Sequence, residues 1–165
     1  MNRKTIVFLT GAGISAESGL KTFRDEGGLW THEEWYELAD VSALQARTQD
    51  CLDFYNMRRK QLLTVFPNHA HKVIAELEQD YNVMVVTQNV DDLHERAGSS
   101  TVIHLHGELR KVCSMADRTT CIMDYPLDIA IKIGDKAADG AQLRPYIVMF
   151  GEGLDTLAVA VDAIK

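Results

Sequence analysis

The sequence lacks the features that mark secreted, membrane-bound and disulfide-stabilised proteins. It has only three cysteines, Cys51, Cys113 and Cys121, an odd number that forms no disulfide framework and suits a reducing compartment. The apolar stretch near the N-terminus, Ile6 to Leu9, is too short for a signal peptide or a membrane span. We therefore expect a soluble cytoplasmic protein without a membrane partner.

Basic residues are also scarce. The chain has 17 Lys and Arg residues against 24 Asp and Glu residues, a formal net charge of -7, and no Lys/Arg-rich run. This charge argues against nucleic acid as a partner. The 165 residues are enough for one compact domain with an apolar core of its own.

Four short apolar segments have the composition of buried strands, and each ends in glycine or polar residues. They are Thr5–Leu9, Asn82–Thr87, Thr101–Leu105 and Tyr146–Phe150. Helical patterns lie between them, over about 31–66 and again after Asn68, where a cap precedes an apolar stripe of Ala70, Val73, Ile74 and Leu77. Strands that alternate with helices predict an α/β protein with a Rossmann-like, mostly parallel sheet.

The segment 112–143 is mixed in composition and rich in turn signals, which predicts a small insertion. Residues 1–111 and 144–165 would then form the Rossmann-like domain, with a helical insertion at about 31–66. The last segment, Leu154–Lys165, has the pattern of a helix that begins to cover the fourth strand.

In an open α/β sheet, ligands bind outside the carboxyl ends of the strands. Gly11 and Gly13 follow the first strand, where glycine allows the backbone to approach a pyrophosphate and a helix start favours phosphate. Gly-Ala-Gly lacks the third glycine of the dinucleotide fingerprint, so on its own it fits a tight strand-to-helix turn equally well.

Longer motifs are more specific. Gly11–Leu20 is followed by Thr22-Phe-Arg24 and Gly28-Leu-Trp30, then by Thr87–Asp91, His104–Glu108, and Leu143-Arg-Pro145 with Phe150-Gly-Glu152. In this order they resemble the signature of the sirtuins, the Sir2-type NAD-dependent protein deacylases, and most closely that of bacterial members. The resemblance covers nearly the whole chain.

The resemblance implies NAD as cofactor and acyl-lysine proteins or peptides as substrates. The products would be nicotinamide, free lysine and an O-acyl-ADP-ribose. The implied general base is His106, since an imidazole can deprotonate a ribose hydroxyl near neutral pH, whereas we expect His104 to be structural. The implied cofactor-binding residues are Gly11, Ala12, Gly13, Ser15, Phe23, Arg24, Trp30, Gln88, Asn89, Val90 and Asp91.

Two further groups concern the substrate. Tyr55 and Arg58 share a helix face and resemble the Tyr-x-x-Arg pattern of sirtuins that prefer succinyl or malonyl groups, since an arginine and a phenol can bind a carboxylate. Spacing alone fits an ordinary amphipathic helix better. Phe150, Gly151 and Glu152 match the family segment that binds the substrate peptide through main-chain hydrogen bonds.

The chain departs from the family pattern at the zinc module. Sirtuins usually hold zinc with four cysteines, but here the insertion has only Cys113 and Cys121 and no C-x-x-C pair. His or Asp could complete a site, with Asp117, Asp124 and Asp128 nearby. The ligand count argues against zinc, and no metal ligands are predicted.

The resemblance also implies further strands after Lys165. Without them the sheet would have an open edge beside the fourth strand, at which self-association is possible. A natural short form and a part of a longer chain both fit.

Two other functions compete with deacylation. One is NAD hydrolysis or ADP-ribosyl transfer, and the other is a non-catalytic module that binds acyl-lysine or ADP-ribose. Tyr55 and Arg58 favour the deacylase over simple NAD hydrolysis, and His106, Asn89 and Asp91 argue against a pure binding module.

Overall fold

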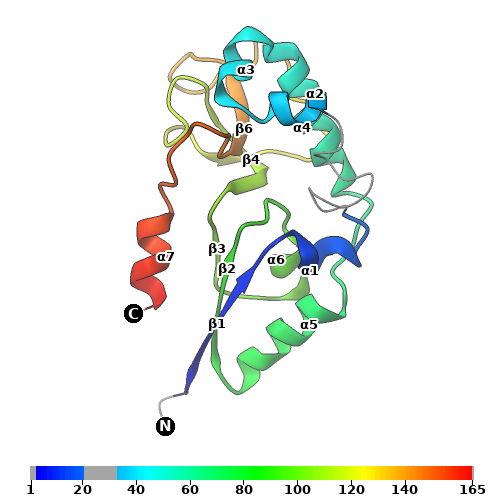
Figure 1. The fold of residues 1–165 in the computed structure, drawn as a ribbon, viewed down its shortest axis with the longest axis vertical. Helices are drawn as coiled ribbons and strands as arrows, with labels where there is room; N and C mark the ends of the chain where they lie inside the picture. The colour runs from blue at the N-terminus through cyan, green and yellow to red at the C-terminus, as the bar shows by residue number, and fades with distance from the viewer. Residues whose placement is uncertain (1–2, 21–32, 165) are drawn as a thin grey trace.

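The computed structural model describes residues 3–20 and 33–164, which form two sheets with helices around them (Figure 1). In chain order the elements are β1 (Thr5–Thr10), α1 (Ala12–Ala16), α2 (Glu33–Leu38), α3 (Val41–Ala46), α4 (Thr48–Gln61), α5 (His69–Glu76), the 3-10 helix η2 (Leu77–Gln79), β2 (Asn82–Thr87), α6 (Leu93–Ala97), β3 (Val102–His104), β4 (Gly107–Ser114), β5 (Met123–Asp124), β6 (Leu143–Ile147) and α7 (Leu157–Ile164).

The first sheet has three parallel strands in the order β1-β2-β3. Thr10 pairs with Thr87, and Thr87 pairs with His104, so the carboxyl ends of all three strands meet at one edge. β2 lies in the centre with Val85 and Val86 buried. The predicted α/β class and parallel sheet are confirmed, and the polar segments that follow β1, β2 and β3 are brought together.

Helices cover both faces of this sheet, and Figure 1 shows α5 and α7 on opposite sides of it. On one side Ile74 of α5 packs with Val83 and Val85. On the other, Ala160 of α7 packs with Val86 and Leu105. Alternate residues of β2 therefore face different helices, as the pleat of a strand requires. The last helix covers the parallel sheet and not the fourth strand, contrary to the prediction.

Asn68 caps α5 as predicted, because its side chain accepts a hydrogen bond from the Ala70 amide at 3.0 Å. The predicted apolar stripe is only partly right. Ile74 is buried, but Ala70 and Val73 are exposed, and the buried face instead includes His71. His71 packs on His94 of α6 with ring centroids 4.8 Å apart, so an aromatic contact replaces the aliphatic one.

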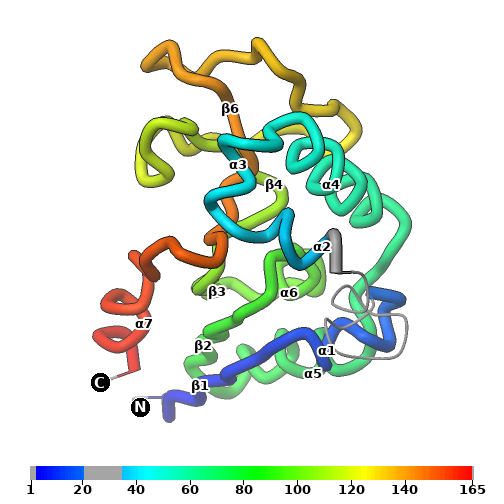
Figure 2. The backbone as a smooth tube through the Cα atoms, turned by 45° about the horizontal axis from the view of Figure 1, so that its top comes forward, coloured from blue at the N-terminus to red at the C-terminus, as the bar shows by residue number. Residues whose placement is uncertain are grey.

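The second sheet is antiparallel, in the order β5-β4-β6. The segment predicted as a fourth parallel strand, Tyr146–Phe150, contributes to β6, which pairs with β4 and not with the parallel sheet. β4 begins shortly after the end of β3 (Figure 2). The main-chain N–H and C=O groups of β4 need hydrogen-bond partners, and β6 supplies them. Pro145, which has no N–H, lies on this edge strand. Within residues 3–20 and 33–164, β1 and β3 are the edge strands of the parallel sheet.

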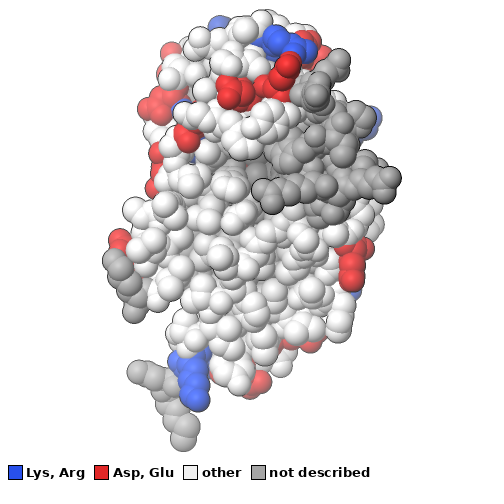
Figure 3. Space-filling view, viewed as in Figure 1, with Lys and Arg blue, Asp and Glu red and all other residues white. Residues whose placement is uncertain are grey.

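Helices α2 to α4 lie beside the second sheet, in the range where helices were predicted (Figure 2). Leu52 of α4 packs with Val112 and Leu143 of that sheet. No helix in the described ranges 3–20 and 33–164 is long and apolar enough to cross a bilayer. The face in Figure 3 has a largely uncharged middle, and its coloured Lys and Arg side chains form separate groups rather than a continuous basic surface.

Candidate active site

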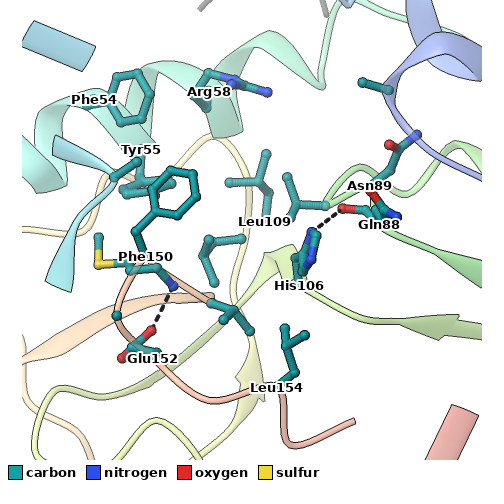
Figure 4. Close-up of a pocket in the computed structure, with 17 residues that line it drawn as sticks. Phe54, Tyr55, Arg58, Gln88, Asn89, His106, Leu109, Phe150, Glu152 and Leu154 are labelled. Atoms are coloured by element: carbon teal, nitrogen blue, oxygen red, sulfur yellow. Dashed lines mark hydrogen bonds between the residues drawn. The ribbon is translucent and has the colours of Figure 1, made fainter. Parts of the chain in front are cut away.

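A cavity of about 380 Å³ opens where the parallel sheet, the second sheet and α4 come together (Figure 4). Most of its wall is formed by α4, the turn after β2, the start of β4, and the end of β6 with the segment that follows it; Ala12 of α1 and Ala39 complete it. Among the lining residues are Ala12, Tyr55, Arg58, Gln88, Asn89, Val90, His106, Phe150, Gly151 and Glu152. Ten residues predicted from sequence for cofactor, catalysis or substrate thus share one cavity.

His106 is half-buried in the wall of this cavity. Its Nδ1 lies 2.9 Å from the carbonyl oxygen of Gln88 (Figure 4). A carbonyl oxygen can only accept, so Nδ1–H is the donor and the lone pair of the neutral ring is on Nε2. This hydrogen bond fixes both the ring orientation and the nitrogen that can take up a proton.

His104 has a different environment. It is buried, with Nδ1 2.8 Å from the carbonyl oxygen of Asn89 and Nε2 2.7 Å from Oε1 of Glu95. Burial alone would lower the pKa of His104, but the hydrogen bond and charge of Glu95 outweigh burial and raise it. The lining of the cavity includes His106 and not His104. The two rings therefore bind the successive carbonyl oxygens of Gln88 and Asn89, but of the two only His106 lines the cavity.

A buried polar chain adjoins the cavity. Asn89 donates from Nδ2 to Oγ of Ser15 at 3.1 Å, and Ser15 donates to Oδ2 of Asp91 at 2.9 Å. The Leu93 amide donates to the other oxygen of Asp91. Burial raises the pKa of Asp91, while the bonds from Leu93 and Ser15 oppose this. Ser15, Asn89 and Asp91 line a small second cavity that shares Ala12 and Arg58 with the first.

The glycines after β1 leave room beside the backbone. A Cβ placed on Gly13 would meet no atom within 4 Å, and one on Gly11 would only contact Oε1 of Gln88 at 3.9 Å. Neither glycine is therefore required by packing among the described residues, which fits a role in ligand approach. Phe23, Arg24 and Trp30, also predicted to bind the cofactor, lie outside the described residues.

Tyr55 and Arg58 come from one face of α4 and both line the cavity, with Arg58 extending toward the side formed by Asn89 and His106 (Figure 4). Tyr55 is 7% exposed and packs edge-on against Phe54, ring centroids 5.0 Å apart. Burial raises the pKa of the Tyr55 phenol and lowers that of Arg58. The pair is thus a buried polar element of the cavity and not the exposed face of an amphipathic helix.

The segment after β6 forms the remaining wall. The main chain of Phe150 is paired with another segment: its amide donates to Ala39 and its carbonyl accepts from Val41, at 2.9 and 3.0 Å. The Glu152 carboxylate points to Arg144 and to the Met149 amide. Glu152 therefore lines the cavity with its carboxylate already bound within the protein. The sequence motif predicted Glu152 as a substrate-binding residue, but it did not predict that Arg144 and the Met149 amide bind its carboxylate.

Cys113 and Cys121, the cysteines of the segment 112–143, do not converge on a ligand set in the described residues. Cys113 is buried, with its thiol 3.7 Å from the Pro145 carbonyl oxygen, and burial raises its pKa to about 11. The group of possible ligands within 4.8 Å of one another is Glu95, His104 and Glu108. His104 is bound to Glu95, and Glu108 is bound to Lys111. These side chains already have protein partners.

A parallel sheet with polar turns converging at its carboxyl edge defines a Rossmann-like α/β protein with a ligand cavity at that edge. The family model described as "Sir2 family" matches residues 11–165 of this chain. The chain belongs to the Sir2 family.

Curated relatives and solved structures agree with this assignment. An "NAD-dependent protein deacylase" of Bacteroides thetaiotaomicron is 53% identical over 165 residues, covering 98% of this chain and 70% of that protein. One from Helicobacter pylori strain J99 is 54% identical, covering 98% and 68%. A Sir2 homologue mutant in complex with ADP-ribose has a TM-score of 0.82 at 42% identity. The superposition covers 98% of this chain and 64% of the chain in that structure.

Proposed function

We propose that this protein is an NAD-dependent deacylase of acyl-lysine residues in proteins or peptides. The observation that carries the proposal is that His106, Asn89 and Arg58, from three separate elements, line one cavity. The names of the relatives and the Sir2 homologue solved with NAD support NAD as the cofactor.

The residues of the cavity fit the nicotinamide riboside part of NAD. Amide groups at Gln88 and Asn89 and a carboxylate at Asp91 provide donors and acceptors for hydroxyl and carboxamide groups. NAD, when bound, supplies a ribose carbon that becomes electrophilic as nicotinamide leaves. His106 accepts a ribose hydroxyl proton at Nε2, because Nδ1 is bound to Gln88. Asn89 and Asp91 are held in place by Ser15 and orient the ligand.

We further propose that acidic acyl groups are preferred. Arg58 provides a guanidinium beside Tyr55 in a cavity with an otherwise mainly apolar α4 wall that includes Phe54. A carboxylate at the end of a succinyl or malonyl group would offset the cost of burying this cation. Phe150 and Gly151 border the route by which the lysine chain enters.

The test is to incubate the purified protein with NAD and either an acetyl-lysine or a succinyl-lysine peptide. Mass spectrometry should find deacylated peptide, nicotinamide and acyl-ADP-ribose in equal amounts. NAD loss without change in the peptide would indicate a glycohydrolase, and peptide or ADP-ribose binding without turnover would indicate a binding module. Either result contradicts the proposal.

A further inference from the structure

The carboxylate of Glu152 is the centre of a buried ionic cluster behind the cavity wall. Arg144 donates to both of its oxygens, at 2.6 and 3.0 Å, and the Met149 amide donates to one of them at 2.8 Å. Arg144 also donates to the Ile147 carbonyl at 2.7 Å. The side chains of Arg144 and Glu152 are 3% and 14% exposed, so this two-pronged contact is shielded from solvent.

A second arginine joins this cluster from the loop between β4 and β5. Arg118, with its side chain 7% exposed, lies 3.5 Å from Glu152 through Nε. Its terminal nitrogen donates to the Gly153 carbonyl at 2.8 Å and to the Asp155 carboxylate. The guanidinium also lies over the Tyr146 ring, 6.0 Å from its centroid. Arg118 thus contacts Tyr146, which precedes the lining segment in the sequence, and Glu152, Gly153 and Asp155 at its end.

Together, Arg118, Arg144 and Glu152 fix the segment Val148–Leu154 at several points. This segment includes Phe150 and Gly151, which line the cavity directly. Neither Arg118 nor Arg144 lines the cavity, so their effect on a ligand must pass through the segment. Removing one partner would leave a buried charge without compensation, and the segment would relax toward solvent.

We propose that Arg118 is a positioning residue, which together with Arg144 and Glu152 holds Val148–Leu154 in the form that binds the acyl-lysine substrate. This inference rests on the proposed function, because it concerns the substrate wall of the same cavity. It assigns to the inserted region a task in substrate affinity that does not require a metal ion. Asn89 and Asp91 are held by Ser15, and the His106 ring is held by the Gln88 carbonyl. His106 contacts the segment through its main-chain oxygen, which accepts from the Val148 amide at 2.9 Å. We therefore expect these three side chains to keep their positions when Arg118 is replaced.

The key variant is Arg118→Met, which keeps most of the side-chain stem and removes the charge. We expect KM for the acyl-lysine peptide to rise about tenfold, which corresponds to about 1.4 kcal/mol, while kcat and KM for NAD change less than threefold. Arg118→Lys should restore part of the affinity, because an ammonium group can still reach Glu152 or Gly153 but lacks the planar fork.

Arg59→Met is a matched control. Arg59 is a buried arginine that anchors the same inserted region by donating to the carbonyls of Tyr125 and Pro126, and it makes no contact with Val148–Leu154 in the hydrogen bonds of the described residues. We expect this variant to lose thermal stability with an unchanged KM for the peptide. An equal rise in KM in both variants would show that general loosening of the insertion is responsible, and would overturn the inference.

Hydrogen exchange of the folded protein separates this inference from the proposed function. In Arg118→Met the amides of Val148–Leu154 should exchange faster, while those of β1 to β3 keep their wild-type rates. This readout does not depend on turnover. If the wild-type protein has no deacylase activity, the proposed function fails while the exchange result still tests the segment. If wild type is active and Arg118→Met leaves both exchange and KM unchanged, only the inference fails.

Discussion

The imidazole of His106 donates from Nδ1 to the main-chain oxygen of Gln88 over 2.9 Å, which leaves the lone pair of Nε2 available at the cavity. Replacement of His106 by alanine should therefore lower kcat of the proposed deacylation by about 10²- to 10⁴-fold, the usual contribution of a general base. Steady-state assays with the acetyl- and succinyl-lysine peptides measure this loss.

His69 provides the matched control for that measurement. It is the first residue of α5, is exposed, and does not line the cavity. His69→Ala should keep activity within about twofold of wild type, since surface substitutions of this kind have small effects. Similar losses in both variants would remove His106 from the catalytic role.

The charge of Arg58 should determine the preference for succinyl-lysine over acetyl-lysine. In Arg58→Met, kcat/KM for a succinyl-lysine peptide should fall about 30-fold, because a charge-assisted hydrogen bond to the acyl carboxylate is lost. For an acetyl-lysine peptide it should change less than threefold. Competition between the two peptides in one reaction, followed by mass spectrometry, measures the ratio directly. Equal losses on both peptides would make Arg58 a structural residue of α4.

Gly107 is required by the close approach of β4 and β6. Its φ is +79°, and a Cβ there would lie 2.1 Å from the main-chain oxygen of Tyr146. Gly107→Ala should therefore reduce the free energy of unfolding by at least about 2 kcal/mol, from strain and overlap together. Denaturant unfolding followed by circular dichroism gives this value.

Gly134→Ala separates the two contributions. Gly134 also has a positive φ, +98°, but open space surrounds its Cβ position. This variant should lose only about 1 kcal/mol, the cost of the backbone conformation alone. A loss as large as that of Gly107→Ala would mean that the approach of the two strands does not matter.

The buried pair of His71 and His94 should make stability depend on pH. Burial, together with the smaller effect of the neighbouring His71, lowers the pKa of His94 to about 4. The unfolded chain takes up this proton near pH 6.5, so it binds more protons than the folded protein between pH 6.5 and 4. Stability contributed by neutral His94 is therefore lost as the pH falls through this window.

His94→Gln isolates this contribution, since the His104–Glu95 pair and all other carboxylates remain in both proteins. From pH 7 to pH 5 the wild type should lose on the order of 1 kcal/mol more free energy of unfolding than the variant. Urea unfolding at the two pH values measures both slopes. Parallel slopes would show that His94 titrates normally in the folded state.

The sequence predicts the parallel sheet well because its signal is local. Apolar runs such as Asn82–Thr87 end in polar residues, and parallel strands bring those ends to one edge, so the meeting of Gln88, Asn89 and His106 follows from the pattern. The placement of Tyr146–Phe150 could not be predicted in this way. Its strand partner, β4, lies in residues where the sequence predicted no strand, and a short apolar run does not specify which sheet it joins.

Contacts between side chains far apart in the sequence could not be predicted from local sequence patterns either. The motif identifies Glu152 as a substrate residue, but its carboxylate is bound by Arg144 and lies beside Arg118, which no motif contains. His71 interrupts the predicted stripe of α5 because its partner, His94, belongs to another helix. In each case the decisive contact depends on the folded chain and not on spacing along it.

The pairing of Phe150 with Ala39 and Val41 joins two stretches from opposite ends of the chain into a single rim at the cavity mouth. A change of backbone shape in one stretch must be matched by the other, or both hydrogen bonds break. Because this pairing uses main-chain atoms alone, the side chains of Ala39 and Phe150 can be exchanged without breaking it, so the lining of the cavity can change here while the rim keeps its shape.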